Sequence, residues 1–294
     1  GGHNLKVSGD VVSAFGKPID LILRQYPGEF SHEINDYSGL LDMIGRGKVL
    51  VLNDPRAIIP QAKSFFAYLW RLLDSHRLSE MEAKAVRETI PYTKIFSSSD
   101  REQVLSEQDK WVIKSVFGRY SECVYIGAMM TRQEWLEITD YVTQSAQAHV
   151  MQEFVPIKKR IVPYYNGNDY DERLAFGNYG IYFTCGVFSG TCVRWSTDYL
   201  SLDDVVWFTP VGVKKNDSPP YTIKKWQAGQ ADRSAIWEDI ADKAAFQYFY
   251  TTSYTGEYES FSLEPMVVPA ARYNELVSAT EHLAKVFVKT RNLI

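Results

Sequence analysis

The chain has 294 residues, a formal net charge of -4 and a hydrophobic content of 45%. This content allows a substantial core in one large domain or two smaller ones, and it excludes a disordered or fibrous chain. The mildly acidic balance argues against a broad nucleic-acid-binding surface, so we expect no nucleic-acid partner.

The cysteines and the apolar runs bear on the compartment. Cys123, Cys185 and Cys192 form neither a CxxC pair nor a Cys/His metal spacing. An odd count without a recognisable secretory segment predicts a reduced, cytoplasmic compartment. No apolar run reaches the length that spans a bilayer, so we expect no membrane association. The Gly1-Gly2 start and a predicted helix close to the last residue suggest a fragment of a longer protein.

The first fifty residues predict a strand–helix–strand unit. Residues 19–23 and 48–52 are short apolar runs, which predict buried strands. Residues 33–45 between them have amphipathic spacing and end at glycine, which predicts a helix.

Two helices and an extended segment are predicted next. The sequence QAKSFFAYLWRLLDS, which follows Pro60, has helical spacing and carries Lys63 in its first turn. Residues 79–88 predict a second, short helix, and residues 90–93 predict an extended segment.

A hairpin with a lysine in its first strand follows. The sequence WVIKSVFGRYSECVYIG, residues 111–127, has two β-branched, aromatic-rich stretches joined by a link that contains Gly118. Lys114 lies in the middle of the first apolar stretch, where burial of a cation is costly. Either Lys114 is a solvated lysine of an edge strand, or an anionic ligand pairs with it.

A capped helix and a strand come after the hairpin. Thr131 and Glu134 have the spacing of a capping box, which predicts a helix from there to about residue 146. Residues 149–156, HVMQEFVP, predict a strand that ends at its proline. Residues 158–173 predict a polar, turn-rich loop.

The last third predicts a second hairpin, a linker and helices. Residues 179–188 and 191–195 predict two strands around a turn at Ser189-Gly190. Residues 214–220, KKNDSPP, predict a linker before helical segments near residues 233–250 and 270–289. Strands and helices mix throughout, so the predicted class is α/β or α+β.

Four short motifs occur in a characteristic order along the chain. They are QAKSFFAYLW with Lys63, WVIKSVFGRYSECVYIG with Lys114 and Gly118, HVMQEFVP with Gln152, Glu153 and Val155, and SGTCVRWS with Arg194. In this order they resemble the circularly permuted ATP-grasp ligases, and in particular the synthetase domain of the glutathionylspermidine synthases. The resemblance spans roughly residues 19–213.

The resemblance implies an ATP-grasp-like fold, with two β-rich lobes and a nucleotide cleft between them in residues 1–213. A mainly helical segment, residues 214–294, would follow. The implied cofactors are ATP and Mg²⁺, and the implied reaction joins a small-molecule or peptide carboxylate to an amine through an acyl phosphate. The implied site has four parts: Lys63 and Lys114 on the phosphates, the backbone at Gly118 over them, Gln152, Glu153 and Val155 at the adenine, and Arg194 on the transferred phosphate.

Two departures from the family pattern motivate an alternative. Ser115 follows Lys114 where the family usually has proline, and Ser121-Glu122 replace expected glycines. The Glu122 carboxylate would repel phosphate unless it points away.

The second departure is that no metal-binding segment is recognisable, so the magnesium ligands stay unassigned. Glu33-Ile34-Asn35 has the Glu-x-Asn spelling but lies in a predicted helix close to Lys63, and Asp171-Glu172 are weak candidates. The alternative is a non-catalytic ATP-grasp-like binding or scaffold module of a larger protein.

The polar residues of the implied site also have ordinary structural explanations. Lys63 is explained as a solvated helix lysine, and Gln152 and Glu153 as the polar residues of an alternating strand. Arg194 is explained by an ion pair with a nearby carboxylate such as Asp198.

Overall fold

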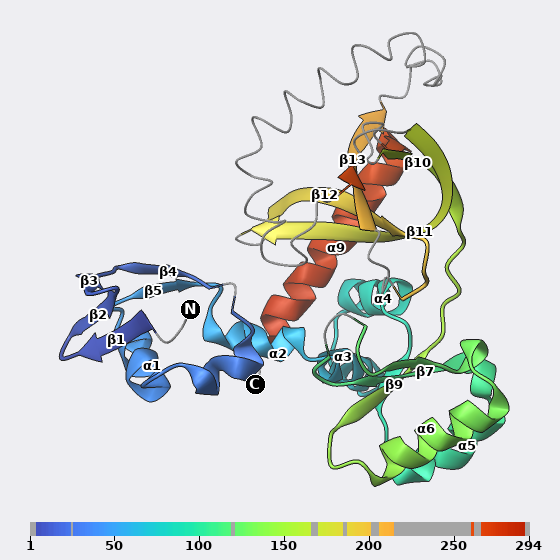
Figure 1. Ribbon diagram of the computed structural model, residues 1–294, viewed down its shortest axis with the longest axis horizontal. Coiled ribbons are helices and arrows are strands. Elements are labelled where there is room, and N and C mark those ends of the chain that lie inside the picture. The colour runs from blue at the N-terminus through green and yellow to red at the C-terminus, as the bar shows by residue number, and fades with distance from the viewer. Residues whose placement is uncertain are drawn as a thin grey trace. The chain divides into compact units, whose positions relative to one another are not determined.

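The computed structural model describes residues 4–24, 26–118, 121–165, 170–184, 187–200, 206–214, 260–261 and 266–291. It has a mixed α/β architecture, which confirms the predicted class (Figure 1). The chain divides into two compact units: unit 1 is Gly1–Phe154 with Val286–Ile294, and unit 2 is Val155–Lys285. In chain order the first division follows Phe154. The predicted organisation into residues 1–213 and residues 214–294 stays a prediction.

Four antiparallel strands form the central sheet of unit 1. In spatial order they are β6 (Thr93–Ile95), β9 (His149–Glu153), β7 (Trp111–Ser115) and β8 (Val124–Ile126). The pairing of β7 with β8 confirms the predicted hairpin. Because β9 lies between β6 and β7, its backbone forms hydrogen bonds on both sides.

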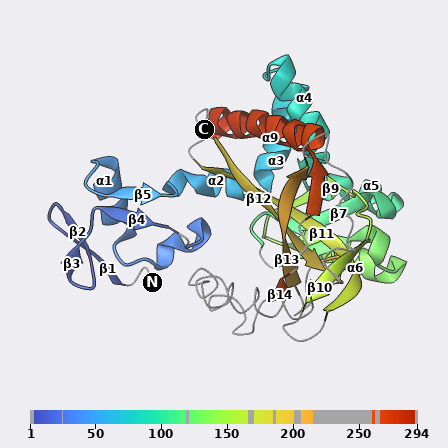
Figure 2. The same cartoon turned by 90° about the horizontal axis from the view of Figure 1, so that it is seen from above.

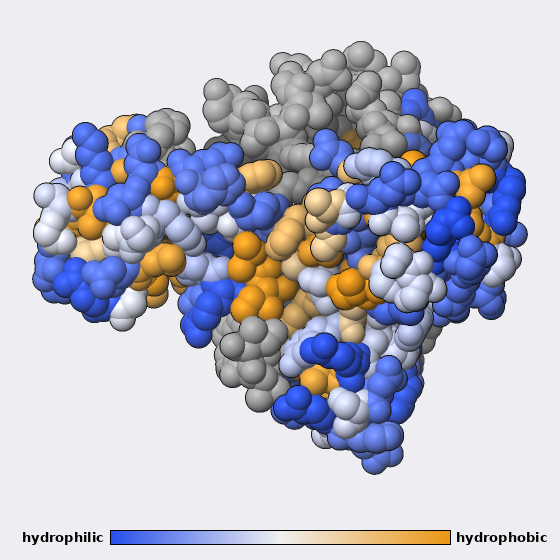
Figure 3. All heavy atoms as spheres, turned by 90° about the horizontal axis from the view of Figure 1, so that it is seen from below, coloured by the Kyte–Doolittle hydropathy of each residue, from blue (hydrophilic) through white to orange (hydrophobic). Residues whose placement is uncertain are grey.

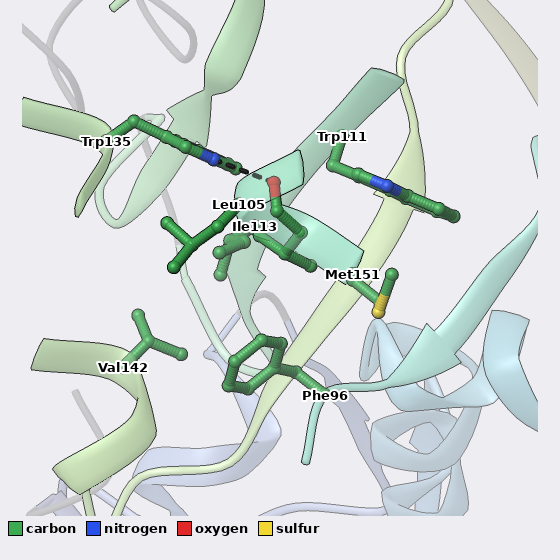
Figure 4. Close-up of a cluster of buried hydrophobic side chains, with 8 residues drawn as sticks. Phe96, Leu105, Trp111, Ile113, Trp135, Val142 and Met151 are labelled. Atoms are coloured by element: carbon green, nitrogen blue, oxygen red, sulfur yellow. Dashed lines mark hydrogen bonds between the residues drawn. The ribbon is translucent and has the colours of Figure 1, made fainter. Parts of the chain in front are cut away.

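The helices α5 (Arg101–Ser106) and α6 (Arg132–Gln144) pack together on one face of this sheet (Figures 1 and 2). The sequence analysis missed α5 but predicted α6, whose capping box between Thr131 and Glu134 is confirmed. Trp135 is fully buried and its indole N–H donates to the Val104 carbonyl at 3.0 Å (Figure 4). The core under these helices contains Phe96, Val104, Leu105, Trp111, Ile113, Trp135, Val142 and Met151.

The helix α3 (Ser64–Asp74) packs on the other side of the sheet, against β6 and β9. It begins at Ser64 after the short helix α2 (Ile58–Gln61), so Lys63 precedes α3 and does not lie in its first turn as predicted. The predicted helix at residues 79–88 is α4 (Glu80–Thr89). The end of α9 (Ala270–Arg291) also belongs to unit 1, where Phe287 contacts Phe65 edge-on.

The start of unit 1 contains strands that the sequence analysis missed. The strands β1 (Leu5–Ser8), β2 (Val11–Ala14) and β3 (Lys17–Pro18) form an antiparallel meander. The predicted strand–helix–strand unit follows as β4 (Leu21–Leu23), α1 (Tyr37–Gly45) and β5 (Leu50–Leu52), with β4 and β5 parallel.

Two expectations for this part were wrong. The strands β4 and β5 are buried on one face only, because Leu21, Leu23, Leu50 and Leu52 are 46% to 69% exposed. Figure 3 shows apolar side chains, in orange, on the surface of this part at the left of the view. The helix α1 begins at Tyr37 with Asp36 as its N-cap, so Glu33-Ile34-Asn35 precedes the helix and does not lie inside it.

Unit 2 is built on a six-stranded sheet. Its strands are β10 (Arg160–Tyr165), β11 (Tyr170–Thr184), β12 (Val187–Ser196), β13 (Val206–Lys214), β14 (Ser260–Phe261) and β15 (Met266–Pro269). The first four are antiparallel neighbours, and β14 and β15 both pair with β13 in parallel. One face carries the core of the unit, formed by Val162, Tyr164, Ala175, Val193, Trp195 and Trp207.

The structure corrects two predictions in unit 2. Residues 158–173 contain β10 and the start of β11, where a polar loop was predicted. In the second hairpin Thr184 of β11 pairs with Val187 of β12, and Ser189-Gly190 lies within β12. The predicted C-terminal helix is α9, whereas nearly all of the predicted linker and the helical segment near 233–250 lie outside the described residues.

None of the helices in the described ranges has the length and apolar character needed to cross a membrane.

We predict that Trp135→Ala lowers the free energy of unfolding by about 3–5 kcal/mol, since it leaves a cavity and an unpaired Val104 carbonyl. Tyr141, on the same helix, is 54% exposed, so Tyr141→Ala should change stability by only about 0.5 kcal/mol. Urea unfolding followed by far-UV circular dichroism measures both. Equal costs for the two variants would contradict the assignment of this core.

Candidate functional site

Lys114 lies on the face of the central sheet that packs towards α3. Strand alternation puts Ile113 and Met151 under α5 and α6, and puts Lys114 with Val150 and Gln152 on the opposite face. The Lys114 ammonium donates a hydrogen bond to Gln152 Oε1 at 2.6 Å. Lys114 is therefore neither a solvated lysine of an edge strand nor a partner of a protein carboxylate among the described residues.

A row of polar side chains continues from Lys114 across the sheet. Gln152 is 9% exposed, and its Nε2 donates to Thr93 Oγ1 at 2.8 Å. The Thr93 hydroxyl in turn donates to the Pro91 carbonyl at 2.8 Å. Both ends of the Gln152 amide are thus engaged, and its oxygen holds the Lys114 ammonium in position.

Lys63 approaches the link after Lys114 from the start of α3. Its ammonium donates to the Gly118 carbonyl at 3.0 Å, and its backbone N–H donates to the Val116 carbonyl at 3.0 Å. A Cβ atom on Gly118 would lie 2.9 Å from the Glu122 carbonyl oxygen and 3.5 Å from the Lys63 ammonium. Only glycine fits there without a shift of the backbone, so this packing explains the residue type.

Burial and the nearby Lys63 charge both disfavour the charged form of Lys114. Burial of the Lys114 ammonium lowers its pKa to about 8, and the positive charge of Lys63 contributes in the same direction. No carboxylate among the described residues forms an ion pair with Lys114. A half-buried ammonium without an anion is unfavourable, so the arrangement favours an anionic ligand.

Glu153 and Val155, the other residues predicted for the adenine, belong to different units: Glu153 ends β9 in unit 1, and Val155 is the first residue of unit 2. The Glu153 side chain is exposed, and its backbone N–H donates to the Tyr92 carbonyl at 2.8 Å. Val155 is 55% exposed, and its carbonyl accepts a hydrogen bond from the Tyr199 hydroxyl at 3.1 Å. Binding of a base by these residues stays a prediction.

Arg194 lies in unit 2, on the exposed face of β12. Its neighbours across the sheet are Asn178 on β11 and Phe208 on β13. Arg194 forms no hydrogen bond or ion pair with another described residue, so the expected ion pair with Asp198 is absent. Its role beside the two lysines stays a prediction, because they belong to the other unit.

The loop that departs from the family pattern keeps a backbone shape typical of glycine. Ser121 and Cys123 have φ angles of +60° and +52°, in the left-handed region that glycine adopts most easily. The Glu122 side chain is exposed. Ser115 is 1% exposed, and its hydroxyl donates to the Phe117 carbonyl at 2.9 Å. Sequence reasoning missed this contact, because it depends on the turn geometry after β7.

The described residues contain no cluster of three or more His, Cys, Asp or Glu side chains that could hold a metal ion. Glu33, of the Glu-x-Asn sequence, accepts a hydrogen bond from the Tyr26 hydroxyl. Glu172 is exposed on β11. The magnesium ligands therefore stay unassigned.

Residues 2–174, more than half of the chain, match the protein family described as "Circularly permuted ATP-grasp type 2". The chain therefore belongs to this family. The finer resemblance to the synthetase domain of glutathionylspermidine synthase stays a prediction. No curated protein matches the chain in a sequence comparison.

Two solved structures are similar at low identity. D-cycloserine synthetase DcsG has 12% identity and a TM-score of 0.33, with 60% of this chain and 52% of that chain covered. D-alanyl-alanine synthetase A from Vibrio cholerae has 12% identity and a TM-score of 0.38, with 79% of this chain and 63% of that chain covered. The chain thus spans between half and two thirds of the length of these proteins. The family assignment rests on the family match.

The pKa of Lys114 predicts a pH dependence of stability. It falls from 10.5, its ordinary value, to about 8 in the folded protein. Between these values the unfolded chain binds more protons, so this group makes the free energy of unfolding rise as the pH increases from about 8 towards 10.5. Lys114→Met removes that contribution and should leave stability at neutral pH equal or higher.

Urea unfolding of both proteins across this pH range measures the difference. Lys84→Met, at a lysine of α4 whose side chain is 69% exposed, is the matched control and should keep the wild-type dependence. If the free energy of unfolding depends on pH in the same way in the wild type and in Lys114→Met, the pKa of Lys114 is not lowered by folding.

Proposed function

We propose that the chain is the nucleotide-binding part of an ATP-dependent carboxylate–amine ligase that acts through an acyl phosphate. Membership of the circularly permuted ATP-grasp family supports ATP as the ligand. The single observation that carries the proposal is a pair of lysines: Lys63 donates to the Gly118 carbonyl, and Lys114 is half-buried and donates to Gln152 with no carboxylate partner among the described residues.

A triphosphate would supply the missing anion. It carries roughly four negative charges, and charge-assisted hydrogen bonds from ammonium groups are the contacts that hold such a group. Lys63 directly precedes α3, an 11-residue helix, so the positive end of the helix dipole lies beside the same link. Lys63, Lys114 and the start of α3 together form a positive environment around residues 116–118.

The remaining predicted residues complete this proposal. Gln152 holds the Lys114 ammonium, and the base would lie near Glu153 and Val155. Arg194 would contribute from unit 2 as the cation on the transferred phosphate, since its guanidinium stays charged and binds oxyanions in a bidentate way. Mg²⁺ would be bound chiefly by the phosphates, because this ion typically keeps its waters and takes only one or two protein carboxylates.

The chemistry requires positioning more than a reactive side chain. The γ-phosphoryl group of ATP moves to a carboxylate oxygen of the first substrate and leaves ADP. The amine nitrogen then attacks the carbonyl carbon, the C–N bond forms, and inorganic phosphate leaves. Fixed cations that neutralise the moving charge and hold the reactants close can supply most of this catalysis. The resemblance to glutathionylspermidine synthase favours a peptide acid and a polyamine as the first substrates to test.

Lys114→Met should weaken ATP binding by roughly 10- to 150-fold, the loss of one charge-assisted contact worth about 1.5–3 kcal/mol. Isothermal titration calorimetry with ATP and Mg²⁺ measures this change. Lys110→Met, at a nearby lysine whose side chain is 65% exposed, is the control and should bind as the wild type does. Equal ATP affinities for the wild type and Lys114→Met would show that Lys114 does not contribute to ATP binding.

The ligase activity is tested by ADP release from ATP and Mg²⁺ in the presence of acid and amine substrates. We expect release that requires both an acid and an amine, and a large loss of release in Arg194→Met with ATP binding retained. A rise in melting temperature with ATP but no release with any substrate pair would support a non-catalytic binding module. No change in melting temperature at millimolar nucleotide would contradict both functions, because a ligand that binds only the folded state must stabilise it.

A further inference from the structure

Ser115 connects three segments around the proposed phosphate site. Its backbone N–H donates to the Cys123 carbonyl at 3.1 Å, which ties the far end of the link to β7. Its hydroxyl donates to the Phe117 carbonyl at 2.9 Å and accepts a hydrogen bond from Gln147 Nε2 at 2.8 Å. The side chain is 1% exposed, so these hydrogen bonds are shielded from competing water.

Gln147 is itself held in place, in the connection between α6 and β9. Its backbone N–H donates to Ser145 Oγ at 3.0 Å, and its carbonyl lies 2.8 Å from His149 Nδ1. The next residue also contributes, because the Ala148 carbonyl accepts from the Val116 N–H at 3.0 Å. Hydrogen bonds with the connection before β9 and with Lys63 therefore both hold residues 116–118.

We propose that Ser115 and Gln147 form a latch that sets the position of residues 116–118 relative to Lys63 and Lys114. This inference rests on the proposed function, and it assigns two positioning residues that act through the backbone of the link. A proline after Lys114 would restrict the backbone covalently, but it has no N–H to offer Cys123. Any residue other than proline can make the N–H bond to Cys123, and the serine hydroxyl adds the hydrogen bonds to Phe117 and Gln147. The departure from the family pattern is thus a different way to hold the same segment.

The latch predicts an effect that is specific to phosphate. Ser115→Ala should weaken ATP binding about tenfold and Gln147→Ala about threefold, since each removes hydrogen bonds that position the link. Adenosine, which lacks phosphates, should bind both variants as it binds the wild type. The double variant should bind ATP no more weakly than Ser115→Ala, because the two residues act as one unit.

Hydrogen exchange of the backbone amides provides a readout that does not depend on nucleotide. Peptides that contain residues 115–118 should exchange faster in both single variants, because the link opens more often. Thr139→Ala is the matched control. It removes another fully buried hydroxyl, which donates to the Trp135 carbonyl at 2.7 Å within α6, and it should change neither the exchange of this segment nor ATP binding.

Each outcome decides the proposal. ATP affinities of Ser115→Ala and Gln147→Ala within about twofold of the wild type would overturn the latch, as would equal losses for ATP and adenosine. If the wild type does not bind ATP, the proposed function fails, and the exchange of residues 115–118 decides the latch alone: faster exchange supports it and unchanged exchange overturns it. Gln147 is an exposed residue, so Gln147→Ala provides the same test if Ser115→Ala does not fold.

Discussion

The structure of unit 1 depends on how a sheet accommodates one half-buried ammonium. Lys114 on β7, Gln152 on β9 and Thr93 on β6 form a continuous row of hydrogen bonds across three strands, which ends at the Pro91 carbonyl. Such a row is stable only if every member finds its partner, because a half-satisfied buried network is costlier than an apolar one. A slip of one residue in β9 would turn Gln152 into the core under α5 and α6 and place Met151 opposite the lysines. The row therefore fixes the register of the sheet and the place of the charge together.

The site has features that are unfavourable for stability alone and are useful for binding. The Lys63 charge opposes that of the Lys114 ammonium, and Ser121 and Cys123 adopt backbone angles that glycine would adopt at lower cost. Locally unfavourable features of this kind are expected at ligand-binding sites, where other interactions in the protein offset their cost. Here the compensation comes from the surrounding hydrogen bonds and from the core around Trp135, which holds the opposite face of the sheet.

Short local sequence patterns correctly predicted the helices and strands that such patterns determine. The capping box at Thr131 and the β-branched stretches of residues 111–127 identified α6 and the hairpin correctly. The meander β1–β3 was missed because its strands are two to four residues long and only partly buried. In unit 2, Ser189-Gly190 has the composition of a turn, but Gly190 lies inside β12, next to a register shift in β11. The composition of a short segment does not distinguish a turn from an irregular strand.

The same limit applies to the site. The sequence placed Lys63, Lys114 and Gly118 in one constellation, and the structure brings these three together. It could not assign Gln152 to Lys114, because that contact depends on which strands are neighbours and in which register. Nor could it identify Ser115 and Gln147 as partners, since they are 32 residues apart in sequence. Contacts between distant residues follow from topology, which local patterns do not encode.

The central claim is that the Lys114 ammonium is held without an anion until phosphate binds. Its pKa can be measured directly by NMR titration of lysine side chains labelled with ¹³C, with Lys114→Met used to assign the signal. The account predicts a pKa of about 8 in the free protein and a clear rise when ATP is bound, because the phosphates stabilise the charged form. A Lys114 pKa that is the same with and without saturating ATP would contradict it.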